Sequence, residues 1–222
     1  MLVIRKYQEP YDRKFIREIC CDTAFLGDPA EKFFDGREIV ADLLTLYYTD
    51  YEPESVFVAE LTGQIVGYLT GCKNIKRQKR IFITRILPII AVRFILSDSI
   101  LKKKNILFLY HCILSFLKKE FFTTDVLSEY PATLHINIDV RYRDLGIGKK
   151  LINEYICYLK NEKVKGVCLA TVSVDAVRFF KKMGFTVLQK KKVSYFSYPN
   201  HKKLYRFILG RKLTDEKADV IE

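Results

Sequence analysis

Apolar and polar residues first alternate and then repeat at helical spacing over the first fifty residues. The segment Leu2–Tyr7 alternates apolar and basic side chains, which predicts a first β-strand. Asp12 is placed to cap a helix whose apolar face follows it: Phe15, Ile16, Ile19 and Cys20. The segment Asp22–Asp35 is rich in turn residues and predicts a loop. A second helix is then expected from another apolar face: Ile39, Leu43, Leu44 and Tyr47.

Two β-rich segments follow, separated by two turn residues. Ser55–Leu61 and Gln64–Thr70 flank Thr62-Gly63, and this spacing predicts a tight β-hairpin. Residues 72–128 then far exceed a normal connection between strands. Their long apolar segments, interrupted by basic residues, predict helices rather than strands. We interpret residues 72–128 as a helical insertion.

The remaining pattern is that of alternating strands and helices. Leu134–Val140 predicts a strand, and a Gly-containing turn leads into a helix over Gly146–Lys160. Further elements are expected in the order strand, helix, strand, strand: Gly166–Thr171, Asp175–Met183, Phe185–Val193 and Lys203–Leu209. The order predicts an α/β fold: one domain over residues 1–210 with a mixed sheet flanked by helices, and the insertion between the third and fourth strands. Residues 211–222 are expected to form a polar tail.

Composition agrees with one folded domain that binds anions. The chain has 222 residues, 49% of them hydrophobic, which suffices for one core, and 14% aromatic residues argue against disorder. The net charge of +12 favours anionic partners such as phosphate groups, although a lysine-rich solvated surface explains it equally well. The six cysteines show no zinc-binding or C-x-x-C spacing, and several lie in apolar segments, as in a reducing compartment. We find no signal-peptide pattern and expect a cytoplasmic protein.

The turn after the predicted strand Leu134–Val140 is the most informative segment. Gly146 and Gly148 lie where a strand leads into a helix, and Lys149 and Lys150 follow. Glycine lets backbone N–H groups approach a phosphate oxygen closely, and a helix N-terminus favours an anion. Tight packing between strand and helix is the alternative reason for these glycines. The dinucleotide-binding pattern is not met, because Leu151 stands where its third glycine would be.

Two motifs resemble those of the GNAT superfamily of N-acyltransferases. Arg143-x-x-Gly146-x-Gly148 is similar to the superfamily's signature for the pyrophosphate of acyl-CoA. The segment Ser173–Phe185 is similar to its N-x-x-A-x-x-F-Y-x-x-x-G-F helix, with Ser173 at the Asn position and Phe179 at the first aromatic position. The resemblance covers residues 1–71 and 129–210. Within the superfamily, the segment before the turn looks closest to the acetyltransferase-like region fused to some O-GlcNAc hydrolases.

The resemblance implies an acetyl-CoA site. It implies that the strand before the turn separates from its parallel neighbour and pairs with the pantetheine arm through Ile138–Val140. It also implies a pyrophosphate on the N–H groups of the turn, with these residues: Arg143, Leu145, Gly146, Ile147, Gly148, Lys149 and Lys150. Ser173 is expected either to bond pantetheine or to cap the following helix.

Acyl transfer to an amine needs a base, because an ammonium group cannot attack a thioester. The resemblance places Phe180 where the superfamily has its usual acid, a tyrosine, so that acid is absent here. His135, Asn137 and Asp139 alternate along one strand face, opposite Leu134, Ile136, Ile138 and Val140. Asp139 is our first candidate for the base and His135 the second. The alternatives are a turn cap for Asp139 and a structural role for His135.

Further candidates are weaker. Asn137 stands where some members have a carboxylate, and an amide cannot act as a base. Tyr195 and Tyr198 can supply a phenol but equally fit exposed strand aromatics.

These observations predict an N-acetyltransferase that moves an acetyl group from acetyl-CoA to a primary amine of a small molecule or peptide. The alternative is a non-catalytic module that binds acyl-CoA. Nucleic acid is not expected as a partner, because the basic residues are scattered and no known binding motif occurs. Three interpretations of the insertion stay open: helices that cover the sheet edge, a homodimer interface, or a basic amphipathic surface for anionic lipid. The first is preferred, so membrane contact is not expected.

Overall fold

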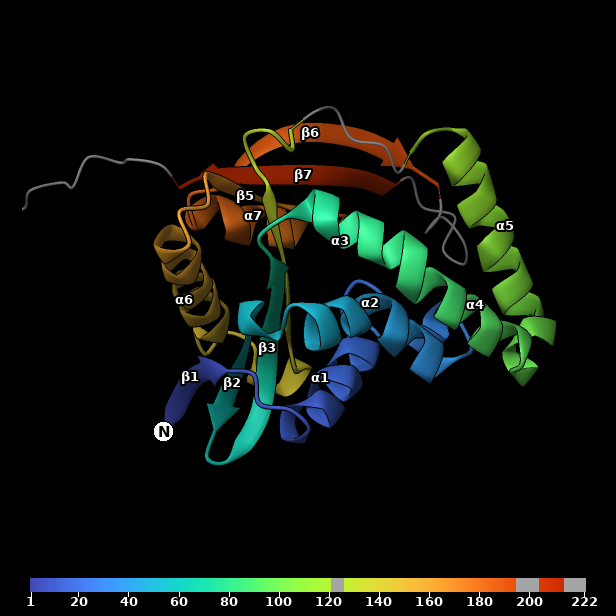
Figure 1. Cartoon of the computed structure of the whole chain (residues 1–222), viewed down its shortest axis with the longest axis horizontal. Coiled ribbons are helices and arrows are strands. Elements are labelled where there is room, and N and C mark those ends of the chain that lie inside the picture. Colours follow the sequence, from blue (N-terminus) through green and yellow to red (C-terminus); the bar gives the residue numbers. More distant parts are fainter. Residues whose placement is uncertain (121–125, 195–203, 214–222) are drawn as a thin grey trace, which may run out of the picture.

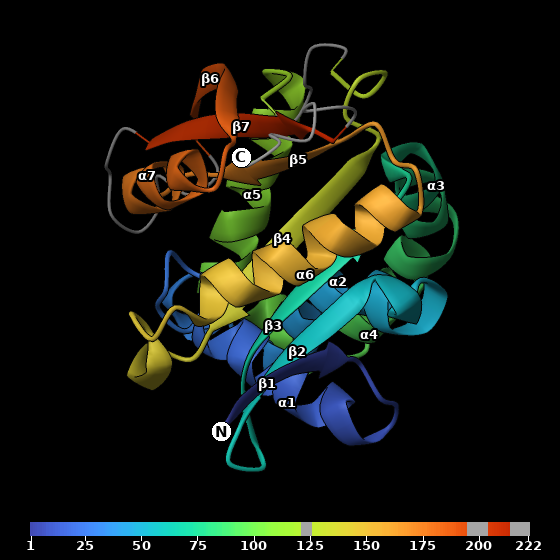
Figure 2. The ribbon, with the colours of Figure 1, turned by 90° about the vertical axis from the view of Figure 1, so that its left-hand side faces the viewer.

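A mixed seven-stranded sheet forms the centre of the protein. A computed structural model describes residues 1–120, 126–194 and 204–213 (Figures 1 and 2). The strand order is β1-β2-β3-β4-β5-β7-β6. The strands are β1 Leu2–Lys6, β2 Val56–Leu61, β3 Gln64–Cys72, β4 Ala132–Ile138, β5 Gly166–Thr171, β6 Thr186–Val193 and β7 Leu204–Lys212. The predicted α/β fold with a mixed sheet is confirmed.

Among the described residues, seven α-helices flank the sheet or project from it. They are α1 Tyr11–Asp22, α2 Arg37–Tyr51, α3 Ile75–Ile81, α4 Leu87–Ile95, α5 Lys103–Leu117, α6 Ile147–Asn161 and α7 Val174–Lys182. A π-helical turn over Phe82–Ile86 joins α3 to α4. Short 3₁₀ segments occupy Ala30–Lys32, Pro53–Ser55, Asp98–Leu101 and Val140–Tyr142.

The predicted hairpin is confirmed at its two turn residues. Thr62 and Gly63 both have positive φ, 50° and 82°, as a two-residue hairpin turn of the twisted kind requires. The register pairs Leu61 with Gln64 and continues, across one irregularity after Ala59, to Val56 with Thr70. Antiparallel pairing then extends through β3 to β4, where Gly67 faces Ile138 and Cys72 faces Thr133.

The neighbouring parallel strands β4 and β5 stay together over a very short distance. Their pairing comprises Ala132 with Val167 and Thr133 with Cys168, and ends there. Beyond this point β4 remains bound to β3, and β5 remains bound along its whole length to β7. The two strands therefore separate without losing their outer partners.

Helices cover both faces of the sheet. Figure 2 shows α6 in front of β2, β3 and β4, with α1 and α2 behind them. The buried face of α6 comprises Leu151, Ile152, Tyr155, Ile156 and Leu159, as its apolar spacing predicts. These side chains share a core with β2 to β5 and with α7. A second core lies on the opposite face, where Ile16, Ile19 and Cys20 of α1 pack on Val56, Val58 and Tyr68.

The described residues between β3 and β4 include helices α3, α4 and α5, as predicted. These helices extend to one end of the molecule, far from the N-terminus (Figure 1). No helix among the described residues is both long and apolar enough to cross a bilayer. All six cysteines are free thiols, and four of them are buried: Cys20, Cys21, Cys72 and Cys168.

Three local predictions are wrong. Asp12 does not cap α1; its buried carboxylate accepts hydrogen bonds from Arg5, at 2.6 and 2.9 Å, and from the Gln8 N–H at 2.7 Å. The strand expected over Leu134–Val140 ends at Ile138, because a 3₁₀ turn begins at Val140. The polar tail does not begin at residue 211, since Arg211 and Lys212 pair with β5.

The Tyr155 hydroxyl fixes the point at which β4 leaves β5. It donates to the Thr133 carbonyl at 2.9 Å and lies 3.3 Å from the Cys72 carbonyl. The Thr133 hydroxyl in turn donates to the Cys168 carbonyl of β5 at 2.7 Å. A side chain at Gly71 would not fit, because its Cβ would lie 2.2 Å from the same hydroxyl.

We expect Tyr155→Phe to lower the free energy of unfolding by about 1–2 kcal/mol, because buried carbonyls lose their donor. Urea unfolding followed by circular dichroism measures this change. Tyr11→Phe, at an exposed tyrosine of α1, is the matched control and should leave the unfolding midpoint unchanged. Equal midpoints for the two variants would show that the hydroxyl does not stabilise the strand separation.

Candidate active site

A cleft of about 820 Å³ opens where β4 and β5 separate. One wall is formed by Leu134–Ile138 of β4 and the other by Leu169–Ser173 at the end of β5. Backbone N–H and C=O groups on these facing edges lack a strand partner across the gap. Buried backbone groups need hydrogen-bond partners, so the gap is suited to an extended ligand with amide groups.

The N-terminus of α6 forms one end of the cleft. Gly146 adopts φ 72°, a left-handed conformation that favours glycine, and nothing lies within 4 Å of where its Cβ would be. A Cβ on Gly148 would lie 3.1 Å from the Phe179 ring and 3.3 Å from Ile138. The helical ladder starts with the Lys150 N–H bound to the Gly146 carbonyl at 3.3 Å. The N–H groups before Lys150 therefore point out of the helix and can receive an anion.

The N-terminus of α7 lies on the other wall of the same cleft. The Ser173 hydroxyl caps this helix by accepting the Ala176 N–H at 3.2 Å. Of the two roles expected for Ser173, the structure shows the capping role and also places the residue at the cleft wall. Two helix N-termini thus contribute positive potential to one cavity.

The structure brings most of the predicted cofactor residues to the cleft. Eight of them line it: Ile138, Arg143, Gly146, Ile147, Gly148, Lys149, Ser173 and Phe179. Val140, Leu145 and Lys150 do not. Val140 lies beyond the strand and is 55% exposed, so the expected pairing edge Ile138–Val140 is corrected to an edge that ends at Ile138.

The loop after α1 closes the opposite side of the cleft. Thr23, Ala24, Leu26 and Gly27 line it, together with Leu44 of α2. A Cβ on Gly27 would lie 3.1 Å from the Arg143 guanidinium, so this loop and the glycine turn are in contact. Arg143 has no ion-pair partner among the described residues, and its charge is free to bind an anion at this junction.

His135 faces the cleft from the middle of β4. Protein surrounds the ring, which is accessible to solvent from the cavity. Burial lowers the pKa of His135 below its ordinary value, because the surroundings disfavour the charged imidazolium. The imidazole has no hydrogen-bond partner among the residues that the structure describes. A neutral, unpaired imidazole at pH 7 is able to accept a proton.

Asn137 lies two residues along β4, on the face that His135 shares. Its Nδ2 donates to the buried Tyr68 hydroxyl at 2.9 Å, which fixes the amide in the cleft wall. Leu134, Ile136 and Ile138 face the α6 core, as the alternation predicted.

Asp139 lies outside the cleft lining, because β4 ends one residue before it. Its carboxylate caps the 3₁₀ turn by accepting the Arg141 N–H at 3.0 Å, and it pairs with the Arg141 guanidinium at 2.6 Å. These bonds lower the pKa of Asp139, because Arg141 stabilises the charged form. Of the two roles weighed for Asp139, its position and low basicity match the turn cap.

Phe180 occupies the position expected for an acid and is almost fully buried, with 5% exposure. Its ring packs edge-on against Phe179 and Phe185 at centroid distances of 5.3 and 5.4 Å, and it lines the cleft. A phenyl ring cannot donate a proton there. Tyr195 and Tyr198, the phenols considered as replacements, lie outside the described residues.

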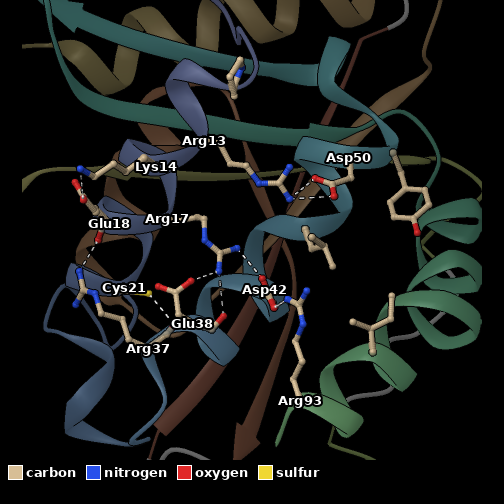
Figure 3. Close-up of a pocket in the computed structure, with 14 residues that line it drawn as sticks. Arg13, Lys14, Arg17, Glu18, Cys21, Arg37, Glu38, Asp42, Asp50 and Arg93 are labelled. Atoms are coloured by element: carbon tan, nitrogen blue, oxygen red, sulfur yellow. Dashed lines mark hydrogen bonds and ion pairs between the residues drawn. The ribbon is translucent and has the colours of Figure 1, made fainter. Parts of the chain in front are cut away.

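A second cavity, of about 710 Å³, lies between α1, α2 and α4 and is lined by charges (Figure 3). Arg17 bridges Glu38 and Asp42 at 2.5 and 2.7 Å, and Arg93 of α4 reaches the same Asp42. Arg13 pairs with Asp50 at 2.8 Å. Because its cations and carboxylates pair with one another, this cavity joins α4 to the domain and offers little free charge to a ligand.

Sequence reasoning missed one side of the cleft. It found the glycine turn and the α7 helix through their motifs. The cleft is also lined by residues that belong to no motif: Leu26, Gly27, Leu169, Thr171 and Arg206. The glycine at position 27 was a possible sequence signal, but turn chemistry explained it equally well. Its φ of 99° and its closeness to Arg143 are seen only in the structure.

Comparisons with known proteins agree with this geometry. The family model for the acetyltransferase (GNAT) domain matches residues 124–196, which contain both motifs. The structure of SsHAT has a TM-score of 0.72 at 24% identity, covering 96% of this chain and 99% of that one. No curated protein matches the chain.

Two further solved structures share the fold at lower identity. Polyamine N-acetyltransferase from Drosophila melanogaster, which catalyses the formation of N-acetylagmatine, has a TM-score of 0.62 at 13% identity, over 96% of this chain and all of that one. The yncA protein of Salmonella typhimurium, solved with its cofactor acetyl-CoA, has a TM-score of 0.59 at 16% identity, over 98% of this chain and 96% of that one.

The chain therefore carries a segment that matches the acetyltransferase (GNAT) domain model, within a fold that these solved structures share. Its resemblance to the region fused to O-GlcNAc hydrolases stays a prediction.

Lys149 and Lys150 are adjacent, but of these two residues Lys149 lines the cleft and Lys150 does not. We expect Lys149→Glu to weaken acetyl-CoA binding about 10-fold or more, equivalent to about 1.4 kcal/mol. Titration calorimetry measures the Kd. Lys150→Glu is the matched control, because it makes the same change in charge and so the same change in long-range potential. It should alter Kd by less than about three-fold, since Lys150 does not line the cleft. Equal losses in the two variants would contradict a local phosphate site at the α6 N-terminus.

Proposed function

We propose that this protein transfers the acetyl group of acetyl-CoA to a primary amine of a small molecule or peptide, by direct attack within a ternary complex. The observation that carries the proposal is the separation of β4 from β5 beyond Thr133, with two helix N-termini at the cleft that results. The match to the acetyltransferase (GNAT) domain supports it.

The residues present fit acetyl-CoA. The α6 N-terminus, Lys149 and Arg143 would hold its pyrophosphate, and the open β4 edge up to Ile138 would pair with its pantetheine arm. Bound there, acetyl-CoA supplies an activated thioester carbonyl. The glycine at position 148 lets Phe179 and Ile138 lie close to the start of α6, because a Cβ there would be 3.1 and 3.3 Å from them.

His135 is the base in this proposal, and Asp139 is not. The His135 imidazole faces the cleft, has a lowered pKa and is neutral at pH 7, so it can take the proton of the acceptor ammonium. The free amine would then form the C–N bond as the C–S bond breaks, and the second proton that its nitrogen loses would pass to the thiolate or to water. Asp139 is held by Arg141 outside the cleft and is a weak base for this purpose.

The leaving thiolate departs without help from the position usual in the superfamily, because Phe180 has no proton to donate. A thiol with a pKa of about 8–9 is a tolerable leaving group near neutral pH. The acceptor enters from the side of the Thr23–Gly27 loop, which lies across the cleft from α7.

A non-catalytic module that binds acyl-CoA is the second candidate, and the buried Phe180 favours it. A thiol-release assay with acetyl-CoA and a panel of primary amines separates the two functions. Amine-dependent release of CoA supports the enzyme. Binding of acetyl-CoA by calorimetry without release for any amine supports the module.

We expect His135→Gln to lower kcat about 100-fold or more, as loss of a general base does, with the Kd for acetyl-CoA changed less than about three-fold. Since the pKa of His135 is lowered, wild-type kcat should hold from pH 8 down to about 6.5 and fall below it, as the imidazole becomes protonated. The variant should lose this acidic limb. Steady-state rates at saturating substrate between pH 5 and about 9 test both statements.

Two controls accompany this variant. His111→Gln replaces a histidine of α5 outside the cleft and should keep full activity. Asp139→Asn should retain at least about half of wild-type kcat, because a turn cap contributes to stability rather than to proton transfer. A large loss in Asp139→Asn with a normal His135→Gln would return the base to Asp139.

A further inference from the structure

The outward face of α4 carries apolar side chains and no charge. Its exposed apolar residues outside the charged cavity are Leu87, Val92 and Ile95, with Leu96 directly after the helix, and they are between 43% and 80% exposed. The charged residue of this helix, Arg93, pairs with Asp42 of α2 while its side chain stays 57% exposed, on the side of the helix that faces the charged cavity (Figure 3). A helix at the surface of a water-soluble domain normally has the opposite arrangement, with its charges outside.

The α5 helix repeats the arrangement. Its exposed apolar residues recur at three- and four-residue spacing along one stripe: Ile106, Leu109, Tyr110, Ile113, Phe116 and Leu117. No charged residue occurs between Lys104 and Lys118. On its inner side the helix buries Asn105 and Ser115. The exposed face of α5 is therefore more apolar than part of its buried face.

Both helices are held firmly, so the exposed side chains do not belong to a detached segment. Phe94 of α4 and Phe108 of α5 both pack against Phe34, at centroid distances of 5.7 and 5.9 Å. The Asn105 amide donates to the carbonyls of Asp35 and Ser99, each at 2.7 Å. Lys104 pairs with Asp35 at 2.7 Å. The patch is thus presented by fixed elements at one end of the molecule (Figure 1).

Basic residues surround this apolar surface. Residues 73–120 contain twelve Lys and Arg but two Asp and Glu, and therefore carry most of the chain's net charge of +12. Lys102 and Lys103 are exposed at the start of α5, and Lys118 and Lys119 are exposed after its end. Lysine stems cover apolar surface while their ammonium groups reach the polar layer beyond it.

We propose that the outward faces of α4 and α5 form a docking surface for an anionic membrane, with their apolar side chains in the interface and the lysines on lipid phosphates. This proposal replaces the expectation, drawn from the sequence, that the insertion avoids lipid. Two amphipathic helices with bulky aliphatic and aromatic residues and a lysine rim match the chemistry of such a surface. The proposal does not depend on acyl transfer.

A second copy of the chain fits the same surface less well. A two-fold contact places each patch against itself, so the lysines at both ends of α5 would face an equally basic rim. Nucleic acid would satisfy the lysines but leave the aliphatic stripe exposed to water. An anionic bilayer satisfies both parts of the surface.

Co-sedimentation of the full-length protein with vesicles tests the proposal. We expect binding to vesicles of phosphatidylcholine with about 30% phosphatidylserine, weaker binding to phosphatidylcholine alone, and release at about 0.5 M salt. Ile95→Ser with Ile113→Ser should reduce the bound fraction about 10-fold at unchanged charge. Val3→Ser with Tyr11→Ser, at exposed apolar residues of β1 and α1, is the matched control and should bind normally.

A second pair of variants tests the charge. Lys102→Glu with Lys103→Glu should abolish the preference for anionic vesicles, while Lys160→Glu with Lys165→Glu, an equal change elsewhere on the surface, should reduce binding less than about three-fold. Unfolding midpoints confirm that every variant is folded.

No binding to anionic vesicles, or equal losses in a patch variant and its control, would overturn the proposal. So would a dimer, detected by analytical ultracentrifugation, that Ile95→Ser with Ile113→Ser dissociates while vesicle binding is absent.

Discussion

The separation of β4 from β5 after Thr133 is the constraint on which the site depends. Two parallel strands would normally continue to pair, and the open edges cost hydrogen bonds that water or a ligand must replace. The fold makes this separation stable by giving each strand a full partner on its other side, β3 for β4 and β7 for β5. Tyr155 and the Thr133 hydroxyl then fix the residue at which the strands part. The cleft is therefore a consequence of sheet topology rather than of loop conformation.

Everything placed at that cleft follows from the same geometry. Because β4 ends at Ile138, His135 and Asn137 lie within the gap while Asp139 lies past it and caps a turn. The glycine turn after β4 brings the α6 N-terminus to the opening, and the end of β5 brings the α7 N-terminus to the opposite wall. The position of the strand end thus decides which side chains line the cleft. Because Phe180 fills the position of the usual acid and cannot donate a proton, we propose a protein group only for proton abstraction from the acceptor.

Local signals predicted much of this structure. The Thr62-Gly63 hairpin, the apolar face of α6 and the glycine turn each depend on residues close together in sequence, and all three are present as expected. The errors arose where contacts between different elements, or a turn that ends a strand, decide the structure. Asp12 binds Arg5 of β1 instead of capping its own helix, and Arg211 remains in a strand because β5 lies beside it. Gly27 meets Arg143 across more than a hundred residues, so no local pattern could reveal that contact. Because the α5 helix is apolar, its sequence does not show which of its faces packs against the domain.

We propose that the gap between β4 and β5 binds acetyl-CoA along its open strand edges. Hydrogen–deuterium exchange of the protein with and without CoA tests it residue by residue. We predict that CoA slows exchange at residues 134–138 of β4, at 169–171 of β5 and at 146–149 of the glycine turn, while the charged cavity between α1, α2 and α4 is unchanged. Protection confined to that cavity, or protection absent from both strand edges at saturating CoA, would contradict the account.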